Sequence, residues 1–164
     1  MTLSLEIRFA VLISLLMLLW QTLEYLVGLQ DRFIQYHPAI TLFSLAIPVG
    51  SSYLAIKEKA IQLGGTITFK QAFITGFFIA VFTAVLTVPT QFMFHNLVNP
   101  DFFQTMIDYS TARAASLHMN IPKAKEEATM YFNLPSYIVQ CFFSTLFFGV
   151  IISLVMAWRM RTVK

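Results

Sequence analysis

The chain has 164 residues, of which 57% are hydrophobic and only 12% are charged, and its mean hydropathy is +0.70. Ordinary soluble domains carry about 25% charged residues, so this composition excludes that class and favours an integral membrane protein. The formal net charge of +3 does not indicate nucleic-acid binding, because the basic residues flank apolar runs and form no basic stretch of their own. The expected partner is the lipid bilayer.

The sequence carries none of the short patterns typical of common catalytic sites. It has no HExxH motif, no nucleophile-elbow serine and no Gly-rich phosphate loop, since Gly64-Gly65 alone predicts a turn. The one cysteine, Cys141, lies in an apolar run, so neither a disulfide framework nor a metal-ligand spacing is present. We therefore expect no enzymatic activity, no metal and no cofactor.

Four hydrophobic segments are long enough to be membrane helices. The first covers residues 8 to 28 and lacks a small-x-small cleavage site, so we expect it to be retained rather than removed as a signal peptide. The second covers residues 38 to 56 and begins with Pro38, which suits the first turn of a helix. A basic loop is expected to follow it, beginning at Lys57, Glu58 and Lys59.

The third segment covers residues 69 to 96, and a capping box formed by Thr68 and Gln71 predicts where it begins. Small residues recur at every fourth position in its first half. Four residues advance a helix by slightly more than one turn, so they share one face and let a second membrane helix approach closely. This row consists of Ala72, Gly76, Ala80 and Ala84.

The fourth segment covers residues 135 to 158 and ends in Trp158 and Arg159, residues typical of a membrane interface. It has its own row of small residues at intervals of four, namely Cys141, Thr145, Gly149 and Ser153. We expect the two rows to pack together as a helix-packing seam. The pattern leaves open whether the seam serves packing alone or also a function.

Residues 100 to 133 predict a helical, amphipathic connector between the third and fourth segments. Asn99-Pro100-Asp101 indicates a helix start, with Asn99 as the N-cap and Pro100 in the first turn. Asn120-Ile121-Pro122 ends this helix and begins a shorter one of mixed charge. We expect the connector to lie on the membrane surface, to cap the helix bundle or to bind a partner.

The distribution of Lys and Arg predicts the orientation of the chain. Seven basic residues fall on the side of the two termini and four on the other side, and the more basic side of a membrane protein usually faces the cytoplasm. The seven are Arg8, Lys57, Lys59, Lys70, Arg159, Arg161 and Lys164, and the four are Arg32, Arg113, Lys123 and Lys125. Both termini are therefore expected in the cytoplasm.

Glu24 is the one acidic residue inside a predicted membrane segment. An ionisable side chain within a membrane is costly and is by default a candidate functional site. Gln21 precedes it by three residues, which places both on one face of the helix. The alternatives are that Glu24 lies at the head-group level beside Trp20 and Tyr25, or that it forms a structural hydrogen bond.

His95 and Gln91 lie near the end of the third segment, at the same expected depth as Glu24. If the first and third helices are neighbours, Glu24 and His95 are able to form a charge-assisted pair. A polar pocket is then expected, formed by Glu24, His95, Gln91, Gln21, Tyr137 and Gln140. A proton or a cation is the ligand that such a pocket favours.

Two stretches resemble a known family. Gly64-Gly65-Thr66-Ile67-Thr68-Phe69 is followed by Gln71-Ala72-Phe73 and Gly76, and after one helix by Asn99-Pro100-Asp101-Phe102. In order and spacing these resemble the DUF4199 family, small integral membrane proteins of bacteria, chiefly the Bacteroidota, with no assigned activity. The resemblance implies a four-helix protein of the bacterial inner membrane, and it supplies no catalytic residue to transfer.

Together these observations predict an all-α, polytopic membrane protein with a bundle of four transmembrane helices in a single domain. The function that we expect is that of an accessory or assembly component, which contacts a second copy of the chain or another membrane protein. The alternative is a small oligomeric proton-coupled transporter or ligand sensor that works through Glu24 and His95.

Overall fold

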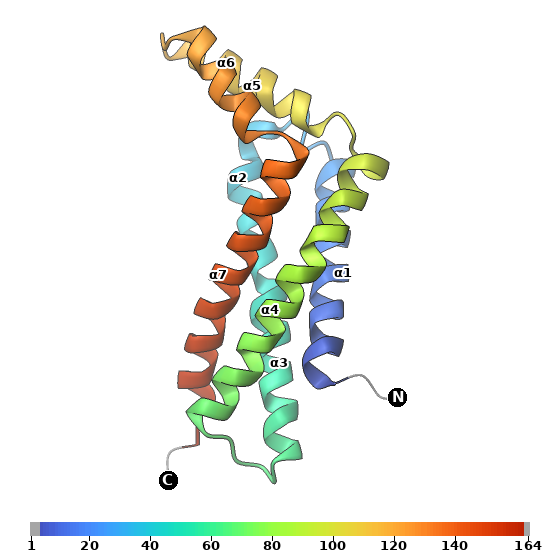
Figure 1. Cartoon of the computed structure of the whole chain (residues 1–164), viewed down its shortest axis with the longest axis vertical. Helices are drawn as coiled ribbons and strands as arrows, with labels where there is room; N and C mark the ends of the chain where they lie inside the picture. Colours follow the sequence, from blue (N-terminus) through green and yellow to red (C-terminus); the bar gives the residue numbers. More distant parts are fainter. Residues whose placement is uncertain (1–3, 163–164) are drawn as a thin grey trace.

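The computed structural model describes residues 4–162, and in this part of the chain the structure is helical, with no strand (Figure 1). The α-helices are α1 Leu5–Leu26, α2 His37–Ile40, α3 Ala46–Gln62, α4 Phe69–Met93, α5 Phe102–Ser116, α6 Ile121–Tyr131 and α7 Leu134–Met160. Short 3-10 turns at Ile34–Tyr36 and Thr41–Leu45 flank α2, and a π-helical turn at Phe94–Val98 extends α4.

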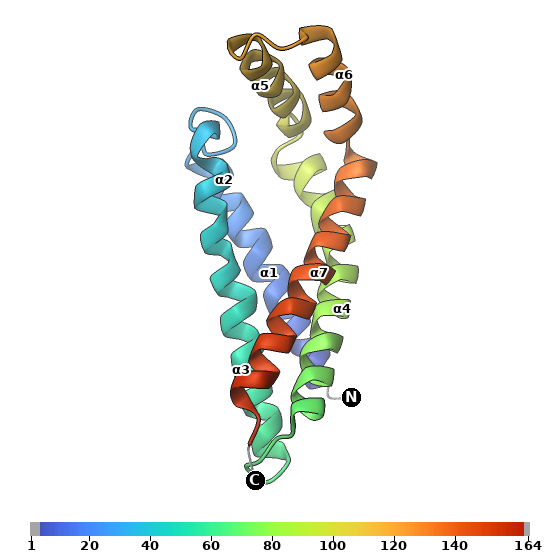
Figure 2. The ribbon, with the colours of Figure 1, turned by 90° about the vertical axis from the view of Figure 1, so that its left-hand side faces the viewer.

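Four stretches are long and apolar enough to cross a membrane, as the hydrophobic segments predicted. They are Leu5–Leu26, Ile34–Gln62, Phe69–Val98 and Leu134–Met160. In Figure 2, α2 and α3 run along one side of the molecule and α4 and α7 along the other, with α1 behind them. The start of α1 and the end of α7 lie at the same end of the bundle (Figure 1).

The second stretch is longer than its expected bounds of 38 to 56. It begins in the 3-10 turn Ile34–Tyr36, and α3 continues through Lys57, Glu58 and Lys59 to Gln62. These charged residues remain helical because two of them contact α1. Arg8 Nη2 lies 2.6 Å from Glu58 Oε1, and Lys59 Nζ lies 3.4 Å from Glu6 Oε1. The expected basic loop is therefore wrong at these three positions.

The start of α4 follows the predicted capping box. The Thr68 hydroxyl accepts a hydrogen bond from the backbone N–H of Gln71, and the Gln71 side chain accepts one from the backbone N–H of Thr68. Each bond satisfies a backbone donor that the first turn of a helix leaves free. The prediction of this helix start is confirmed.

The rows of small residues on α4 and α7 face each other. A Cβ atom added to Gly149 would lie 2.5 Å from the Ala80 Cβ atom, and one added to Gly76 would lie 2.7 Å from the Ser153 Oγ atom. These distances are shorter than van der Waals contact, so the two helices approach as closely as glycine permits. Ala72 and Ala84 are fully buried on the same face of α4.

The connector forms a hairpin of α5 and α6 beyond one end of the bundle (Figures 1 and 2). Its first helix begins at Phe102 rather than at Asn99, and Asp101 occupies the N-cap position without a side-chain hydrogen bond. Asn99 is buried and donates a hydrogen bond from Nδ2 to Gln30 Oε1 at 2.9 Å. The expected N-cap role of Asn99 is therefore wrong, because its side chain bonds to Gln30, in the turn after α1, instead.

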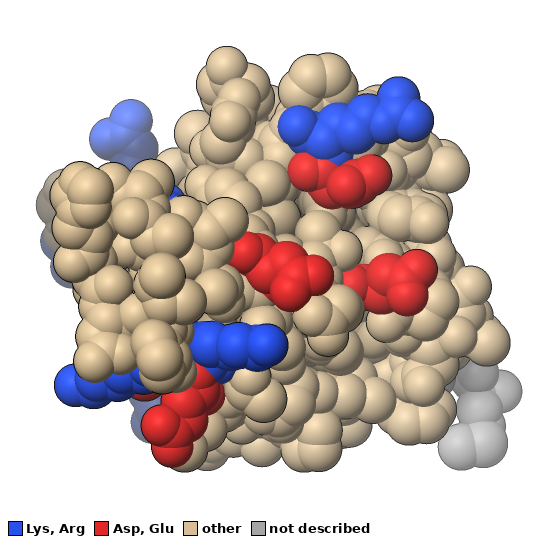
Figure 3. All heavy atoms as spheres, turned by 90° about the horizontal axis from the view of Figure 1, so that it is seen from above, with Lys and Arg blue, Asp and Glu red and all other residues tan. Residues whose placement is uncertain are grey.

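Charge differs between the two ends of the bundle. In the described chain, the end that holds the start of α1 and the end of α7 carries six basic and two acidic residues. The hairpin end carries four basic and five acidic residues, and its surface shows both signs side by side (Figure 3). The bundle is therefore electrically asymmetric along its long axis.

Candidate functional site

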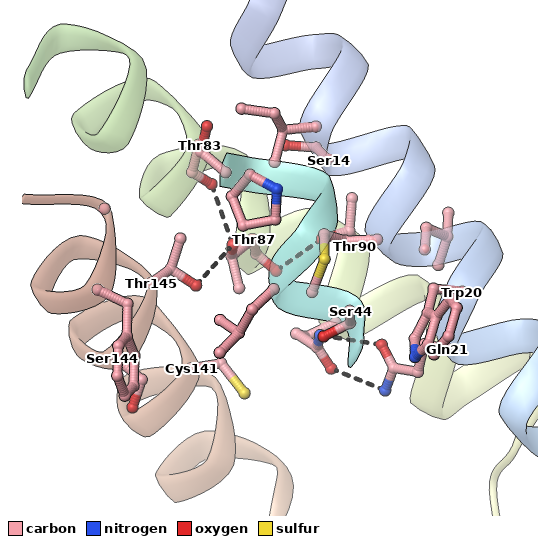
Figure 4. A pocket seen from close by; sticks show the side chains of 18 of the residues that line it. Ser14, Trp20, Gln21, Ser44, Thr83, Thr87, Thr90, Cys141, Ser144 and Thr145 are labelled. Carbon is pink, nitrogen blue, oxygen red and sulfur yellow. Dashed lines mark hydrogen bonds between the residues drawn. The ribbon is translucent and has the colours of Figure 1, made fainter. Parts of the chain in front are cut away.

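A cavity of about 280 Å³ lies between the helices, and Figure 4 shows part of its lining. Side chains of α1, α3, α4 and α7 line most of its wall, together with the segment around α2, Gln30 and Phe102. Its polar lining residues include Ser14, Gln21, Glu24, His37, Ser44, Thr83, Thr87, Thr90, Gln91, Tyr137 and Cys141. A cavity enclosed by helices with a few polar groups is the usual form of a small-molecule site.

Glu24 is the one acidic side chain that lines the cavity, and it is only 4% exposed. The Trp20 indole Nε1 donates a hydrogen bond to Glu24 Oε1 at 2.7 Å, one turn earlier on α1. His37 Nε2 lies 3.4 Å from Glu24 Oε2. A buried carboxylate requires such partners, because a protein interior does not solvate charge as water does.

The turn after α1 places His37 beside Glu24. Gly28 has φ +80°, a left-handed conformation that favours glycine, and it reverses the chain at the end of α1. Leu29 and Gln30 are buried after this turn, and α2 then begins at His37. The imidazole thus reaches Glu24 from the first turns of the membrane-length stretch Ile34–Gln62.

The expected pair of Glu24 and His95 does not form. Among the described residues, Glu24 contacts Trp20 and His37, whereas His95 Nε2 lies 3.1 Å from Gln91 Oε1. His95 lies in the π-helical turn after α4, outside the cavity wall. Its ring packs among four aromatic rings at centroid distances of 4.7 to 5.2 Å, those of Phe94, Phe102, Phe103 and Tyr137.

Two glutamines join α1 to α4 at the cavity. Gln21 Nε2 donates to Gln91 Oε1 at 3.3 Å, and Gln91 Nε2 donates to Gln21 Oε1 at 3.1 Å. Gln91 Oε1 is an amide oxygen and only accepts hydrogen bonds. In this arrangement His95 Nε2 is therefore the donor in the bond between them. His95 therefore orients the amide pair and reaches the cavity only through it.

The two remaining candidates, both on α7, have different surroundings. Tyr137 lines the cavity and packs against His95 and Phe102. Gln140 lies outside the cavity wall and donates a hydrogen bond to the backbone carbonyl of Tyr131 at 3.2 Å. The structure thus brings Glu24, Gln21, Gln91 and Tyr137 to one cavity and leaves His95 and Gln140 outside it.

Four hydroxyl groups in the cavity wall donate their protons within their own helices. The acceptors are backbone carbonyls one turn earlier: Ala10 for Ser14, Ile79 for Thr83, Thr83 for Thr87 and Leu86 for Thr90. A hydroxyl that donates in this way keeps oxygen lone pairs for other partners. With the Glu24 carboxylate they make a wall rich in hydrogen-bond acceptors, and no Lys or Arg lines it.

The family described as "Protein of unknown function (DUF4199)" matches residues 8–162, nearly the whole chain. The chain belongs to the DUF4199 family. No curated protein and no solved structure matches it. The membership confirms the resemblance of the glycine-rich turn and the Asn99–Phe102 stretch, and it assigns no activity to the cavity.

In this DUF4199 chain, sequence reasoning placed Trp20 beside Glu24, but it did not pair Glu24 with His37 and it missed Ser14 as a lining residue. A signal for Ser14 was present, since Ser14, Gln21 and Glu24 recur on one face of α1 at intervals of seven and three. No comparable signal marked His37, because its approach depends on the turn at Gly28. Within residues 4–162, no group of three metal-ligating side chains comes together.

Proposed function

We propose that the chain is a multi-pass protein of the bacterial inner membrane that binds a small, positively charged organic molecule in the cavity, as a ligand sensor or as the binding site of a small transporter. Four membrane-length helices and membership of the DUF4199 family support the location. The excess of basic residues at the end that holds the termini supports a cytoplasmic position for both.

The acceptor-rich wall around a buried carboxylate is the observation that supports a cationic ligand. Glu24 supplies a negative charge, and the hydroxyls of Ser14, Thr83, Thr87 and Thr90 supply oxygen lone pairs. An anionic ligand would meet Glu24 without a Lys or Arg to compensate for the repulsion. A cation instead gains from the carboxylate, and in a site of low dielectric this gain is larger than in water.

Cys141 provides a direct test, because it is the only cysteine of the chain and it lines the cavity. Its labelling rate is measured in the purified protein with two methanethiosulfonate reagents, one bearing ethyltrimethylammonium and the other ethylsulfonate. We expect the rate ratio of cationic to anionic reagent to fall at least about tenfold in Glu24→Gln, which corresponds to about 1.4 kcal/mol. Thiol reactivity itself cancels in the ratio.

Cys141→Ser serves as the control for labelling elsewhere and is expected to remain unlabelled. A ratio that is the same in the original chain and in Glu24→Gln would contradict a cation site at Glu24. Protection of Cys141 from both reagents in the folded protein, relieved only by denaturation, would show that the cavity does not admit small cations.

An assembly role is the second candidate, and the exposed end of the hairpin favours it. Leu117, Met119 and Ile121 are large apolar side chains exposed where α5 turns into α6. Such a patch beyond the bundle suits contact with a second copy of the chain or with another membrane protein. The test replaces all three by serine and asks whether an oligomer or a copurifying membrane protein is lost while the monomer stays folded.

A further inference from the structure

The cavity is elongated along the helix axes. On α1 its lining residues run from Ile13 to Glu24, which lie about 16 Å apart along the helix axis. On α7 they run from Tyr137 to Ile152, a distance of about 22 Å. A volume of about 280 Å³ spread over such a length makes the cavity narrow, so its shape suits a linear ligand rather than a globular one.

One end of the cavity is polar and holds its only carboxylate. The paired hydrogen bonds of Gln21 and Gln91 lie at this end, within one turn of Glu24 on α1. Tyr137 and Phe102 also line it, and Phe102 begins α5, so this is the end nearer the hairpin. A positively charged group is therefore favoured at this end and not elsewhere in the cavity.

Farther along the bundle the wall becomes apolar. Ile13 and Ile79 belong to one buried cluster, and Ala80 meets Gly149 where α4 and α7 pack closely, so these residues of three helices lie at one level. The lining residues of α1, α4 and α7 around this level carry no charge, and Ser14 is the one polar side chain among them. They are Ile13, Ser14, Gly76, Ile79, Ala80, Gly149 and Ile152.

Hydroxyl groups line the stretch between the two ends. The hydroxyl oxygens of Thr87 and Thr145 lie 3.5 Å apart there, across the contact of α4 with α7 (Figure 4). The polarity of the wall thus falls from a carboxylate and amides, through hydroxyls, to isoleucine, alanine and glycine. A second charge at the apolar end would lose its hydration without gaining a partner, whereas a hydrocarbon chain gains from burial there.

We propose that the cavity binds a linear alkylammonium ion whose ammonium group lies at Glu24 and whose chain runs parallel to the helices toward Ile79 and Ile152. The proposal rests on the proposed function and narrows its ligand class to monoamines with an unbranched apolar chain. A diamine is disfavoured, because among the lining residues only Glu24 supplies a negative charge.

Competition by a homologous series tests the proposal. Radiolabelled benzyltrimethylammonium is bound to the purified full chain in equilibrium dialysis and is displaced by ethyl-, butyl- or hexyltrimethylammonium. We expect the concentration for half displacement to fall about fourfold for each added methylene, the value for burial of one such group. Equal concentrations for the three ions would overturn the linear site.

A bis-quaternary ion tests the apolar end separately. Hexamethonium has the six-carbon chain of hexyltrimethylammonium with a second trimethylammonium group at its other end. It should require an at least about tenfold higher concentration for half displacement, because its second charge has no partner at the apolar end. Displacement by hexamethonium at the same concentration as by the hexyl ion would overturn the assignment of that end.

Two neighbouring isoleucines of α7 supply a matched pair of variants. Ile152 lines the cavity, whereas Ile151 is 40% exposed and lies outside the cavity wall. Ile152→Trp should weaken competition by hexyltrimethylammonium at least about tenfold and leave tetramethylammonium unchanged, and Ile151→Trp should change neither. Equal effects of the two substitutions on the hexyl ion would overturn the chain position. The series and hexamethonium use the original chain, so they decide the proposal even if Ile152→Trp does not fold.

Tetramethylammonium separates this proposal from the proposed function, because it carries the charge without the chain. If Glu24→Gln weakens competition by tetramethylammonium but chain length has no effect in the original chain, the cavity remains a cation site and the linear site is overturned. If Glu24→Gln leaves competition by tetramethylammonium unchanged, the proposed function fails, and this proposal fails with it.

Discussion

His37 Nε2 lies 3.4 Å from Glu24 Oε2, so the short helix α2 is joined to the one acidic side chain of the cavity. Both side chains are largely buried, at 18% and 5% exposed. Removing one partner of such a pair is expected to cost more stability than replacing both partners by uncharged residues. The reason is that the remaining partner is left as a buried charge without water around it. This asymmetry makes the pair testable by stability.

His37→Ala should lower the free energy of unfolding by about 2 kcal/mol, since Glu24 then loses the basic side chain that faces its second oxygen. The same His37→Ala substitution in a Glu24→Gln background should cost at least about 1 kcal/mol less, because no charge is left unpaired. Reversible unfolding in mixed micelles of increasing SDS content measures both values. Equal costs in the two backgrounds would show that the two side chains are not coupled.

The contact between α4 and α7 predicts a large effect from a single methyl group. Gly149→Ala places a Cβ atom 2.5 Å from the Ala80 Cβ atom, so the helices must separate, at a cost of about 1–3 kcal/mol. Gly50→Ala is the matched control, because no atom lies within 4 Å of its added Cβ atom. Gly50→Ala should be neutral or slightly stabilising, given the better helix propensity of alanine. Thermal unfolding in detergent compares the two, and similar losses would contradict the close approach.

The paired glutamines predict a coupling energy between α1 and α4. Gln21→Leu and Gln91→Leu each leave a half-buried amide without its reciprocal partner. The double variant should be more stable than the sum of the single effects predicts, by about 0.6–1.7 kcal/mol. The unfolding free energies of the four proteins in the cycle measure this value. Strict additivity would mean that the amides contribute independently.

The charge asymmetry predicts which ends of the helices face the cytoplasm. In a Cys141→Ser background, a cysteine at Ser116, at the end of α5, should react with a membrane-impermeant maleimide in intact spheroplasts. A cysteine at Gln62, at the end of α3, should react only after permeabilisation. The reverse pattern would place both termini outside and would contradict the orientation.

Much of the fold could be predicted from local sequence patterns. Segment length located the four long helices, the Thr68 and Gln71 pair marked the start of α4, and the spacing of small residues on α4 and α7 matches the face where Gly149 meets Ala80. These features depend on neighbours within a turn or on a repeated interval. Such features can therefore be predicted from the sequence alone.

The site could be predicted less well from the sequence, because its contacts depend on how the segments between the long helices fold. Asn99 has the sequence context of an N-cap, yet a hydrogen bond to Gln30 outweighs that local preference. His95 has the expected depth for Glu24, but the π-helical turn carries it among aromatic rings. His37 reaches Glu24 only because Gly28 reverses the chain. Each of these outcomes involves residues whose separation no periodic pattern predicts.

Equilibrium dialysis of the purified protein against radiolabelled benzyltrimethylammonium tests the cation site at Glu24 most directly. We expect saturable binding to one site per chain, weakened at least about tenfold in Glu24→Gln. Unlabelled benzyltrimethylammonium should compete more effectively than neopentylbenzene, its uncharged counterpart of the same shape. Binding that is unchanged in Glu24→Gln, or no saturable binding at all, would contradict a cation site at Glu24.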